Sequence, residues 1–262
     1  KIQRAALSNG LKILLTERHE LPLVNLWLTF DAGYAADQLG IPGAARLTGT
    51  MLTNGTTTRN ALQISDELRS LGAHLNAGSS LDSSYVRLSA LRPKLDDTLA
   101  LFADVVLNPN FPASDFEREK KQLLASIEQE QAEPYSMALR VLPGLIYGKN
   151  HAYGNPLTGS GTPESVGRIT REDLVKFHHT WFHPNNATLI AVGDITMDEL
   201  KSRLEKQFAG WKQAAPPAKN LAQASLAAKP VVYLIDRPGS QQSLIFAGHA
   251  APPRNNPQEI AI

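Results

Sequence analysis

Residues 43–56 read Gly-Ala-Ala-Arg-Leu-Thr-Gly-Thr-Met-Leu-Thr-Asn-Gly-Thr. We expect a helix here, and Gly49 stands in the middle of it. Glycine inside a helix costs about 1 kcal/mol relative to alanine. A helix tolerates that cost when neighbouring segments pack closely against it, so the stretch predicts a helix held tightly by other elements.

Two predicted strands precede this stretch. Residues 11–15, apolar except for Lys12, and apolar residues at alternate positions in 24–30 are typical of strands, and the polar residues 17–20 join them. The opening of the chain therefore predicts a hairpin-like strand pair.

A helix, a second strand pair and another helix follow the stretch. The helical apolar pattern over 61–71 ends at Gly72, because a glycine can take a positive φ and satisfy the last carbonyls of the helix. Residues 75–78 and 85–90 predict the second strand pair, and the apolar spacing in 95–106 predicts the next helix. This ββαββα-like order indicates the α+β class.

Capping patterns mark the helices of the second half. A capping box pairs Ser or Thr with an acidic residue three positions later, and such pairs occur at Ser114/Glu117, Thr170/Asp173 and Thr196/Glu199. The first pair predicts a long charged helix over about 115–131. Between the other two, the apolar residues 187–192 predict a central strand.

The composition changes after Trp211 to Ala, Pro, Lys and Gln. We expect one α+β domain over 1–211, an interdomain linker over 212–229, and the start of a second domain over 230–262. Residues 231–237 and 243–246 weakly repeat the opening strand pair, which predicts a second copy of the same unit. We therefore expect the chain to be a fragment of a longer protein.

The composition also excludes several classes of function. Lys and Arg total 26 against 25 Asp and Glu, so a net charge of +1 provides no broad basic field for nucleic acid. No apolar run approaches the roughly 20 residues needed to cross a bilayer, so we expect no membrane partner. The chain has no cysteine, which excludes disulfides, thiolate zinc sites and cysteine nucleophiles.

The stretch 43–56 resembles the zinc-site segment of the pitrilysin/insulinase (M16) metallopeptidases, in which an inverted His-x-x-Glu-His motif precedes Met-Leu and a Gly-Thr turn. The resemblance continues through the Gly72 turn, the long charged helix, residues 154–159 and the helix before residues 184–186. It implies an α/β sandwich of the LuxS/MPP type with an antiparallel-rich sheet, followed by the start of a second homologous unit.

Carried over position by position, the zinc ligands of the family are absent. The resemblance places the first His at Arg46, the Glu at Gly49, the second His at Thr50 and the third ligand at Ser126. Glu119 matches another helix Glu of the family, but without a metal it has no evident task. A catalytic zinc needs imidazoles, an anionic ligand and a carboxylate base, and an arginine stays protonated and cannot coordinate. The resemblance therefore implies no catalytic residue and no metal in this chain.

Other candidate sites have structural interpretations. His179 and His183 are four residues apart, a spacing that allows a helical metal site, but no carboxylate or third His follows and Pro184 ends the helix. Packing is the favoured interpretation. Residues 159–161 lack the context of a phosphate loop, and the serines in 79–84 have no placed base and are interpreted as turn residues.

The resemblance implies a catalytically inactive unit that forms a heterodimer-like pair with a zinc-bearing M16 unit around a peptide-degrading or processing chamber. The partner is expected to be a separate subunit or an upstream half of the same polypeptide, and zinc is expected on that partner. One alternative is a non-enzymatic scaffold or binding protein of the same fold. Another is an active enzyme whose catalytic group lies outside these residues. Bacterial members are often exported, so the periplasm is the expected location.

Overall fold

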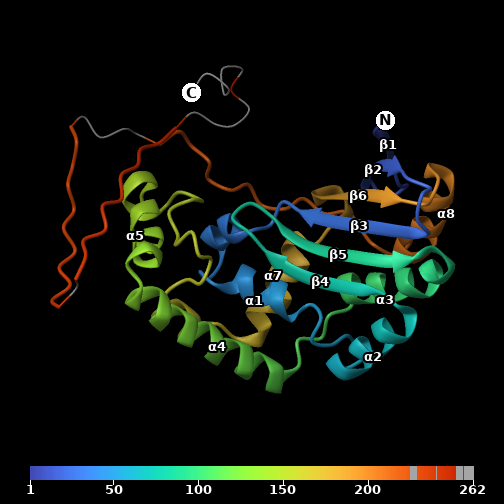
Figure 1. The fold of residues 1–262 in the computed structure, drawn as a ribbon, viewed down its shortest axis with the longest axis horizontal. Coiled ribbons are helices and arrows are strands. Elements are labelled where there is room, and N and C mark those ends of the chain that lie inside the picture. The colour runs from blue at the N-terminus through green and yellow to red at the C-terminus, as the bar shows by residue number, and fades with distance from the viewer. Residues whose placement is uncertain (225–228, 240, 252–255, 257–262) are drawn as a thin grey trace.

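A computed structural model describes residues 1–224, 229–239, 241–251 and 256. Its body is a six-stranded sheet packed against helices (Figure 1). The strands are β1 (Gln3–Ala6), β2 (Lys12–Glu17), β3 (Leu23–Phe30), β4 (His74–Ser79), β5 (Ser84–Leu91) and β6 (Ala187–Gly193). Their order is β1-β2-β6-β3-β5-β4, and only β2 and β6 are parallel neighbours. The predicted α+β class with an antiparallel-rich sheet is confirmed.

The opening strands do not form the predicted hairpin. Both exist, but β6 lies between them, parallel to β2 and antiparallel to β3. The hairpin prediction was wrong because β6 comes from residues far along the chain, and no local pattern reveals such a pairing. The predicted β4–β5 pair and the central position of β6 are confirmed.

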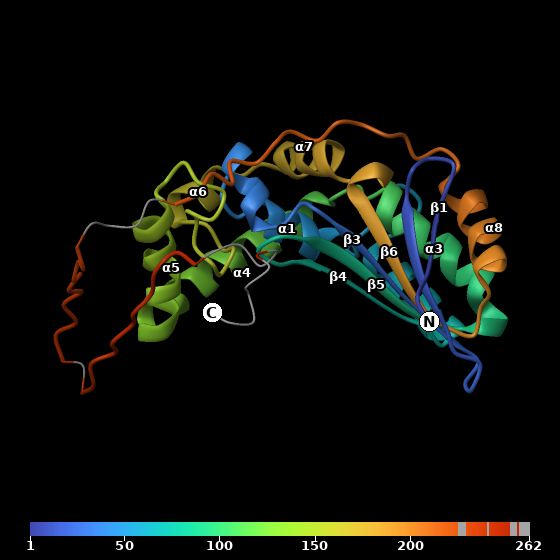
Figure 2. The ribbon, with the colours of Figure 1, turned by 90° about the horizontal axis from the view of Figure 1, so that it is seen from above.

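The helices cover one face of the sheet, and Figure 2 shows the described part of the chain with no helix on the other face. Their bounds are α1 (Ala44–Met51), α2 (Ala61–Leu71), α3 (Leu95–Leu107), α4 (Ala113–Ala132), α5 (Pro134–Tyr147), α6 (Pro163–Arg168), α7 (Arg171–Trp181) and α8 (Met197–Phe208). Short 3-10 turns are η1 (Tyr34–Leu39), η2 (Arg92–Lys94) and η3 (Pro184–Asn186). In β3, every second residue from Val24 to Phe30 is buried under the helices, as its alternating pattern requires.

The helix ends follow the sequence with one exception. Gly72 ends α2 at a φ of 62°, and Thr170 caps α7 in a capping box with Asp173. Thr196 accepts a hydrogen bond from the backbone of Glu199 at the start of α8. The capping box predicted at Ser114 is wrong, because α4 begins directly after Pro112, whose fixed φ suits the entry to a helix.

The chain beyond α8 first lies along the body. The side chain of Asn185 bonds the backbone of Ala214, the ammonium of Lys219 pairs with Asp31, and the ring of His151 bonds the carbonyl of Ala222. Residues 212–222 are thus attached to the body by polar contacts. The division into domains at 211 and 229 stays a prediction.

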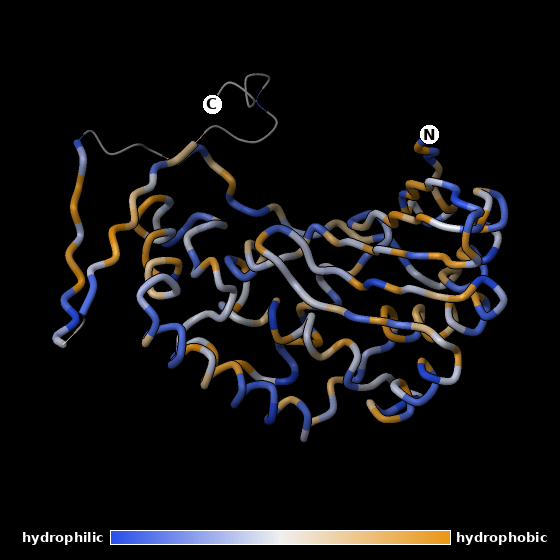
Figure 3. Tube along the Cα trace, viewed as in Figure 1, coloured by the Kyte–Doolittle hydropathy of each residue, from blue (hydrophilic) through white to orange (hydrophobic). Residues whose placement is uncertain are grey.

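The described residues after 228 form an extended arm beside α5 (Figure 1, Figure 3). Several of its apolar side chains are uncovered: Val232 is 91% exposed, Leu234 92% and Ile245 91%, whereas the ring of Phe246 contacts Tyr135 on α5. The strands predicted over 231–237 and 243–246 are not formed by the described residues there. A strand needs a neighbour to pair its backbone groups, and within this chain the arm has no strand beside it in the described part.

Candidate functional site

Helix α1 carries three of the four positions at which the family's zinc motif was sought. It begins after Gly43, which has a φ of 103°, and a buried carboxylate holds this end of the helix. The two oxygens of Asp37 accept hydrogen bonds from the backbone N–H groups of Gly43 and Ala45, at 2.8 and 2.9 Å. Burial raises the pKa of Asp37 to about 7, although these two hydrogen bonds favour the ionised form.

At Gly49, α1 touches β4 with its backbone. A Cβ atom added at this position would lie 2.5 Å from the Oγ of Ser79 and 2.7 Å from the backbone carbonyl carbon of Gly78. The serine hydroxyl is able to turn away, but the strand backbone is not. No side chain therefore fits at Gly49 unless β4 moves. The close packing expected around this glycine is present.

Hydrogen bonds hold the two elements at this distance. The Oγ of Ser79 donates to the carbonyl of Ala45 on α1 at 2.8 Å, and the hydroxyl of Tyr34 donates to the carbonyl of Ser79 at 2.6 Å. The hydroxyls of Ser79 and Ser84 are 2.7 Å apart. These contacts attach the end of β4 to α1 and η1, which gives the serines a structural task.

The Arg46 side chain reaches a polar cluster. Its guanidinium donates to the carbonyl of Thr158 at 3.1 Å and lies 3.5 Å from a carboxylate oxygen of Glu130 on α4. The other Glu130 oxygen accepts hydrogen bonds from Arg140 on α5 and from the hydroxyl of Ser160, both at 2.6 Å. We name these four side chains, Arg46, Glu130, Arg140 and Ser160, the arginine cluster.

The arginine cluster is largely buried and has an excess positive charge. The side chain of Arg140 is 8% exposed and that of Glu130 is 14% exposed. Burial opposes ionisation of Glu130, but the hydrogen bonds from Ser160 and Arg140 outweigh it and hold its pKa below the ordinary value. One carboxylate thus serves two guanidinium groups, and the cluster joins α1, α4, α5 and the loop at 158–161.

The side chains at the other predicted positions do not converge on a common site. Thr50 is exposed, and the hydroxyl of Ser126 donates to the carbonyl of Leu123 within its own helix at 2.8 Å. Glu119 lies near the side chains of Arg118 and Asn54. Among the described residues, no three His, Asp or Glu side chains gather in an arrangement that would hold a metal ion. The residues at positions 46, 49, 50 and 126 do not fit zinc.

Backbone carbonyls contact the ring of His178 on α7 and the ring of His183, which follows this helix, while His179 is exposed on α7. In His183 one ring nitrogen lies 2.8 Å from the carbonyl of His179 and the other 3.1 Å from the carbonyl of Lys212. The buried His178 donates from Nε2 to the carbonyl of Val106 at 2.8 Å. Burial lowers the pKa of His178 to about 4, so this ring is neutral in the fold.

Sequence patterns gave no signal for the arginine cluster or for Asp37. Glu130 and Arg140 lie on two helices separated by a break at Glu133, and Ser160 follows in a loop. Only the packing of α4 against α5 brings them together.

Comparison with known proteins decides the family. The sequence model of the insulinase family, peptidase family M16, matches residues 12–161, and that of the peptidase M16 inactive domain matches residues 168–262. The chain belongs to the M16 peptidase family. This M16 chain also aligns with an uncharacterized zinc protease of Mycobacterium leprae, at 26% identity over 83% of the chain and 49% of that protein.

Two further matches add a subunit and a solved structure. The bovine mitochondrial-processing peptidase subunit beta is 27% identical over 81% of the M16 chain and 44% of its own length. A crystal structure of a peptidase M16 inactive domain from Pseudomonas fluorescens has a TM-score of 0.80 and 30% identity, covering 86% of the chain and 54% of that protein. The chain spans about half the length of the relatives it matches.

Proposed function

We propose that this chain is a catalytically inactive M16 unit that pairs with a zinc-bearing M16 unit, and that the two enclose a chamber in which peptides are cleaved. The observation that carries this proposal is the backbone contact at Gly49. The family resemblance places the catalytic Glu at this position, and there is no room for any side chain there unless β4 moves. A chain without the base and without ligands needs a partner to take part in peptide hydrolysis.

Electrostatics support the same proposal. A divalent cation near Arg46 would be repelled by two guanidinium groups, and Glu130, the carboxylate among them, is already hydrogen-bonded to Arg140 and Ser160. In this interpretation the cluster takes over the structural task of cross-linking α1 and α4. Zinc is proposed to lie on the partner only.

The proposed partner is an M16 homologue with an intact His-x-x-Glu-His motif, either a separate subunit or another half of the same polypeptide. The name of the bovine relative, a subunit of a processing peptidase, is consistent with pairing. No helix in the described part of the chain is long and apolar enough to span a bilayer. We propose the periplasm as the location, on the family resemblance alone.

The test is peptide hydrolysis measured with each component alone and with both mixed. We expect no cleavage by this chain alone and a rate in the mixture that saturates at equal concentrations, abolished by a chelator. Thr50→Ala in this chain is the matched control for replacing the second motif His of the partner: the partner variant should lose activity and the Thr50 variant should keep it.

Two results would contradict the proposal. Full activity of the zinc-bearing unit alone would instead favour the scaffold function for this chain. One zinc per chain by metal analysis, lost on changing Thr50 or Ser126, would show that the chain has a metal site of its own.

A further inference from the structure

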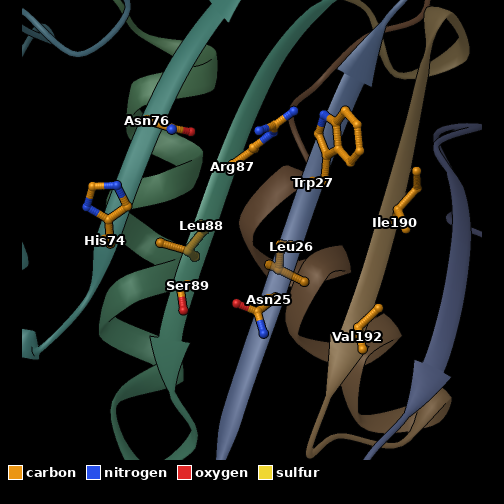
Figure 4. Close-up of a pocket in the computed structure, with 10 residues that line it drawn as sticks. All are labelled: Asn25, Leu26, Trp27, His74, Asn76, Arg87, Leu88, Ser89, Ile190 and Val192. Carbon is orange, nitrogen blue, oxygen red and sulfur yellow. The ribbon is translucent and has the colours of Figure 1, made fainter.

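The uncovered face of the sheet is basic. The strand residues that alternate with the buried ones face this side. In the described strands, those that have a full charge are Arg4, Lys12 and Arg87, and none of them is Asp or Glu. Figure 4 views this face, with helices behind the strands. A surface with cations and no carboxylate favours an anionic ligand.

The strand register aligns one residue of each strand in a row across this face. Starting from β1, the row consists of Arg4, Leu14, Ile190, Trp27, Arg87 and Asn76. We name it the cross-strand row. It has a cation at one end, a cation near the other, and three apolar side chains between them. Trp27 is 39% exposed, although a large apolar side chain is usually covered.

Arg87 is arranged so that its hydrogen-bond donors remain free. Its guanidinium carbon lies 4.3 Å from the centre of the Trp27 ring and 4.5 Å from that of Tyr85. Stacking on rings uses the flat face of the guanidinium and leaves the N–H groups at its edge. In Figure 4 the Arg87 and Trp27 side chains stand together above the strands.

In the described part of the chain, Arg87 differs from the arginines that form ion pairs. Arg59, Arg92 and Arg203 each form an ion pair in which a carboxylate oxygen lies within 3 Å of the guanidinium group. For Arg87 no carboxylate and no hydrogen-bond acceptor is found among the described residues, and its contacts are the two rings. A planar guanidinium with free edge donors is suited to bind a carboxylate through two parallel hydrogen bonds.

We infer that the cross-strand row binds an acidic, otherwise apolar peptide segment, with a carboxylate on Arg87 and apolar side chains on Trp27, Ile190 and Leu14. The inference rests on the proposed function, since it names the class of peptide that this wall of the chamber would hold. Arg4 and Arg87 are four strand spacings apart, roughly 19 Å, which is the length of about six residues of an extended chain. A second acidic residue about six positions away would therefore reach Arg4.

The test uses two labelled ten-residue peptides with the same apolar centre. One has Glu at two positions six residues apart, and the other has Gln at both. We measure their binding to this chain without any partner, by fluorescence anisotropy at low ionic strength. The Glu peptide should bind about fivefold more tightly, and the difference should shrink in high salt because the contact is exposed.

Arg87→Gln should remove most of this preference and leave binding of the Gln peptide nearly unchanged. The matched control is Lys121→Gln, which removes one exposed positive charge from α4 on the helical side and should leave the preference intact. Circular dichroism shows whether both variants are folded, and Arg87→Lys, which keeps the charge but not the planar fork, should retain only part of the preference.

Equal binding of the two peptides, no binding of either, or the same loss in both variants would overturn the inference. So would self-association that Arg87→Gln abolishes, because the face would then be an interface between copies. These results are separate from the test of the proposed function. If cleavage requires both units but the Glu peptide binds no more tightly than the Gln peptide, only this inference is rejected. If the Glu peptide binds more tightly but cleavage does not require both units, only the proposed pairing is rejected.

Discussion

The motif helix α1 and the uncovered sheet face differ in whether their polar groups have partners within the described chain. At α1 the polar groups that the family would use for chemistry are absent or partnered: Gly49 lies on the backbone of Gly78, and Arg46 bonds Thr158 and Glu130. On the sheet face, Arg87 has rings beside it and no acceptor among the described residues. The motif helix is therefore packed against β4 at Gly49, while the guanidinium of Arg87, which the proposed peptide would contact, lies on the open face.

The largest effect is expected at Gly49. Gly49→Glu, and any restoration of the zinc motif that includes it, should lower the free energy of unfolding by at least about 4 kcal/mol, because the side chain meets strand backbone and its charge would be buried. Urea denaturation measures this. Thr50→Glu, on the next and exposed residue, should change stability by less than about 1 kcal/mol. Equal stability of the two variants would show that α1 and β4 are not closely packed at Gly49.

A smaller loss is expected in the arginine cluster. Glu130→Gln should cost about 3 kcal/mol, because two partly buried guanidinium groups would lose their shared counter-charge. Glu128→Gln is the control, since Glu128 is exposed on the same helix. If both substitutions cost the same small amount, the cluster does not replace a metal cross-link.

The third prediction concerns the pH dependence caused by Asp37. Its pKa is about 7 in the fold and near 3.8 when unfolded, so between these values the folded chain holds a proton that the unfolded chain releases. Its contribution to stability therefore falls as pH rises through this window, by up to about 1.4 kcal/mol per pH unit.

Asp37→Asn removes this titration. The stability of the variant minus that of the parent should increase from pH 4 to pH 7 and be flat above, as measured by urea denaturation at several pH values. A difference that does not change with pH would mean that Asp37 is ionised throughout, and that the end of α1 is less deeply buried than its geometry indicates.

The smallest effect is expected on the open face. Arg87→Gln should change the free energy of unfolding by less than about 1 kcal/mol, because its stacking on Trp27 is exposed to solvent. Thermal unfolding of Arg87→Gln, compared with that of Lys121→Gln, measures this change in stability. A large loss would mean that Arg87 is a structural residue, and would remove the difference between the two regions.

Local patterns predicted those elements whose signals lie within a few residues. Gly72 ended α2, the Thr170 box began α7, and the alternation in residues 24–30 marked β3 as a half-buried strand. They failed at the hairpin of β2 and β3, where β6 is inserted. They also failed at 231–237, where a strand pattern has no neighbouring strand in the described chain.

The sequence by itself determined which residues stand at positions 46, 49, 50 and 126, where the resemblance places the zinc motif, because residue identity needs no fold to be read. Only the tertiary structure decided what took their place. The contact of Gly49 with Gly78, the sharing of Glu130 by two arginines, and the row from Arg4 to Asn76 join residues far apart in the chain. Such contacts depend on the order of strands and the packing of helices, and these are set by the whole buried core rather than by any local pattern.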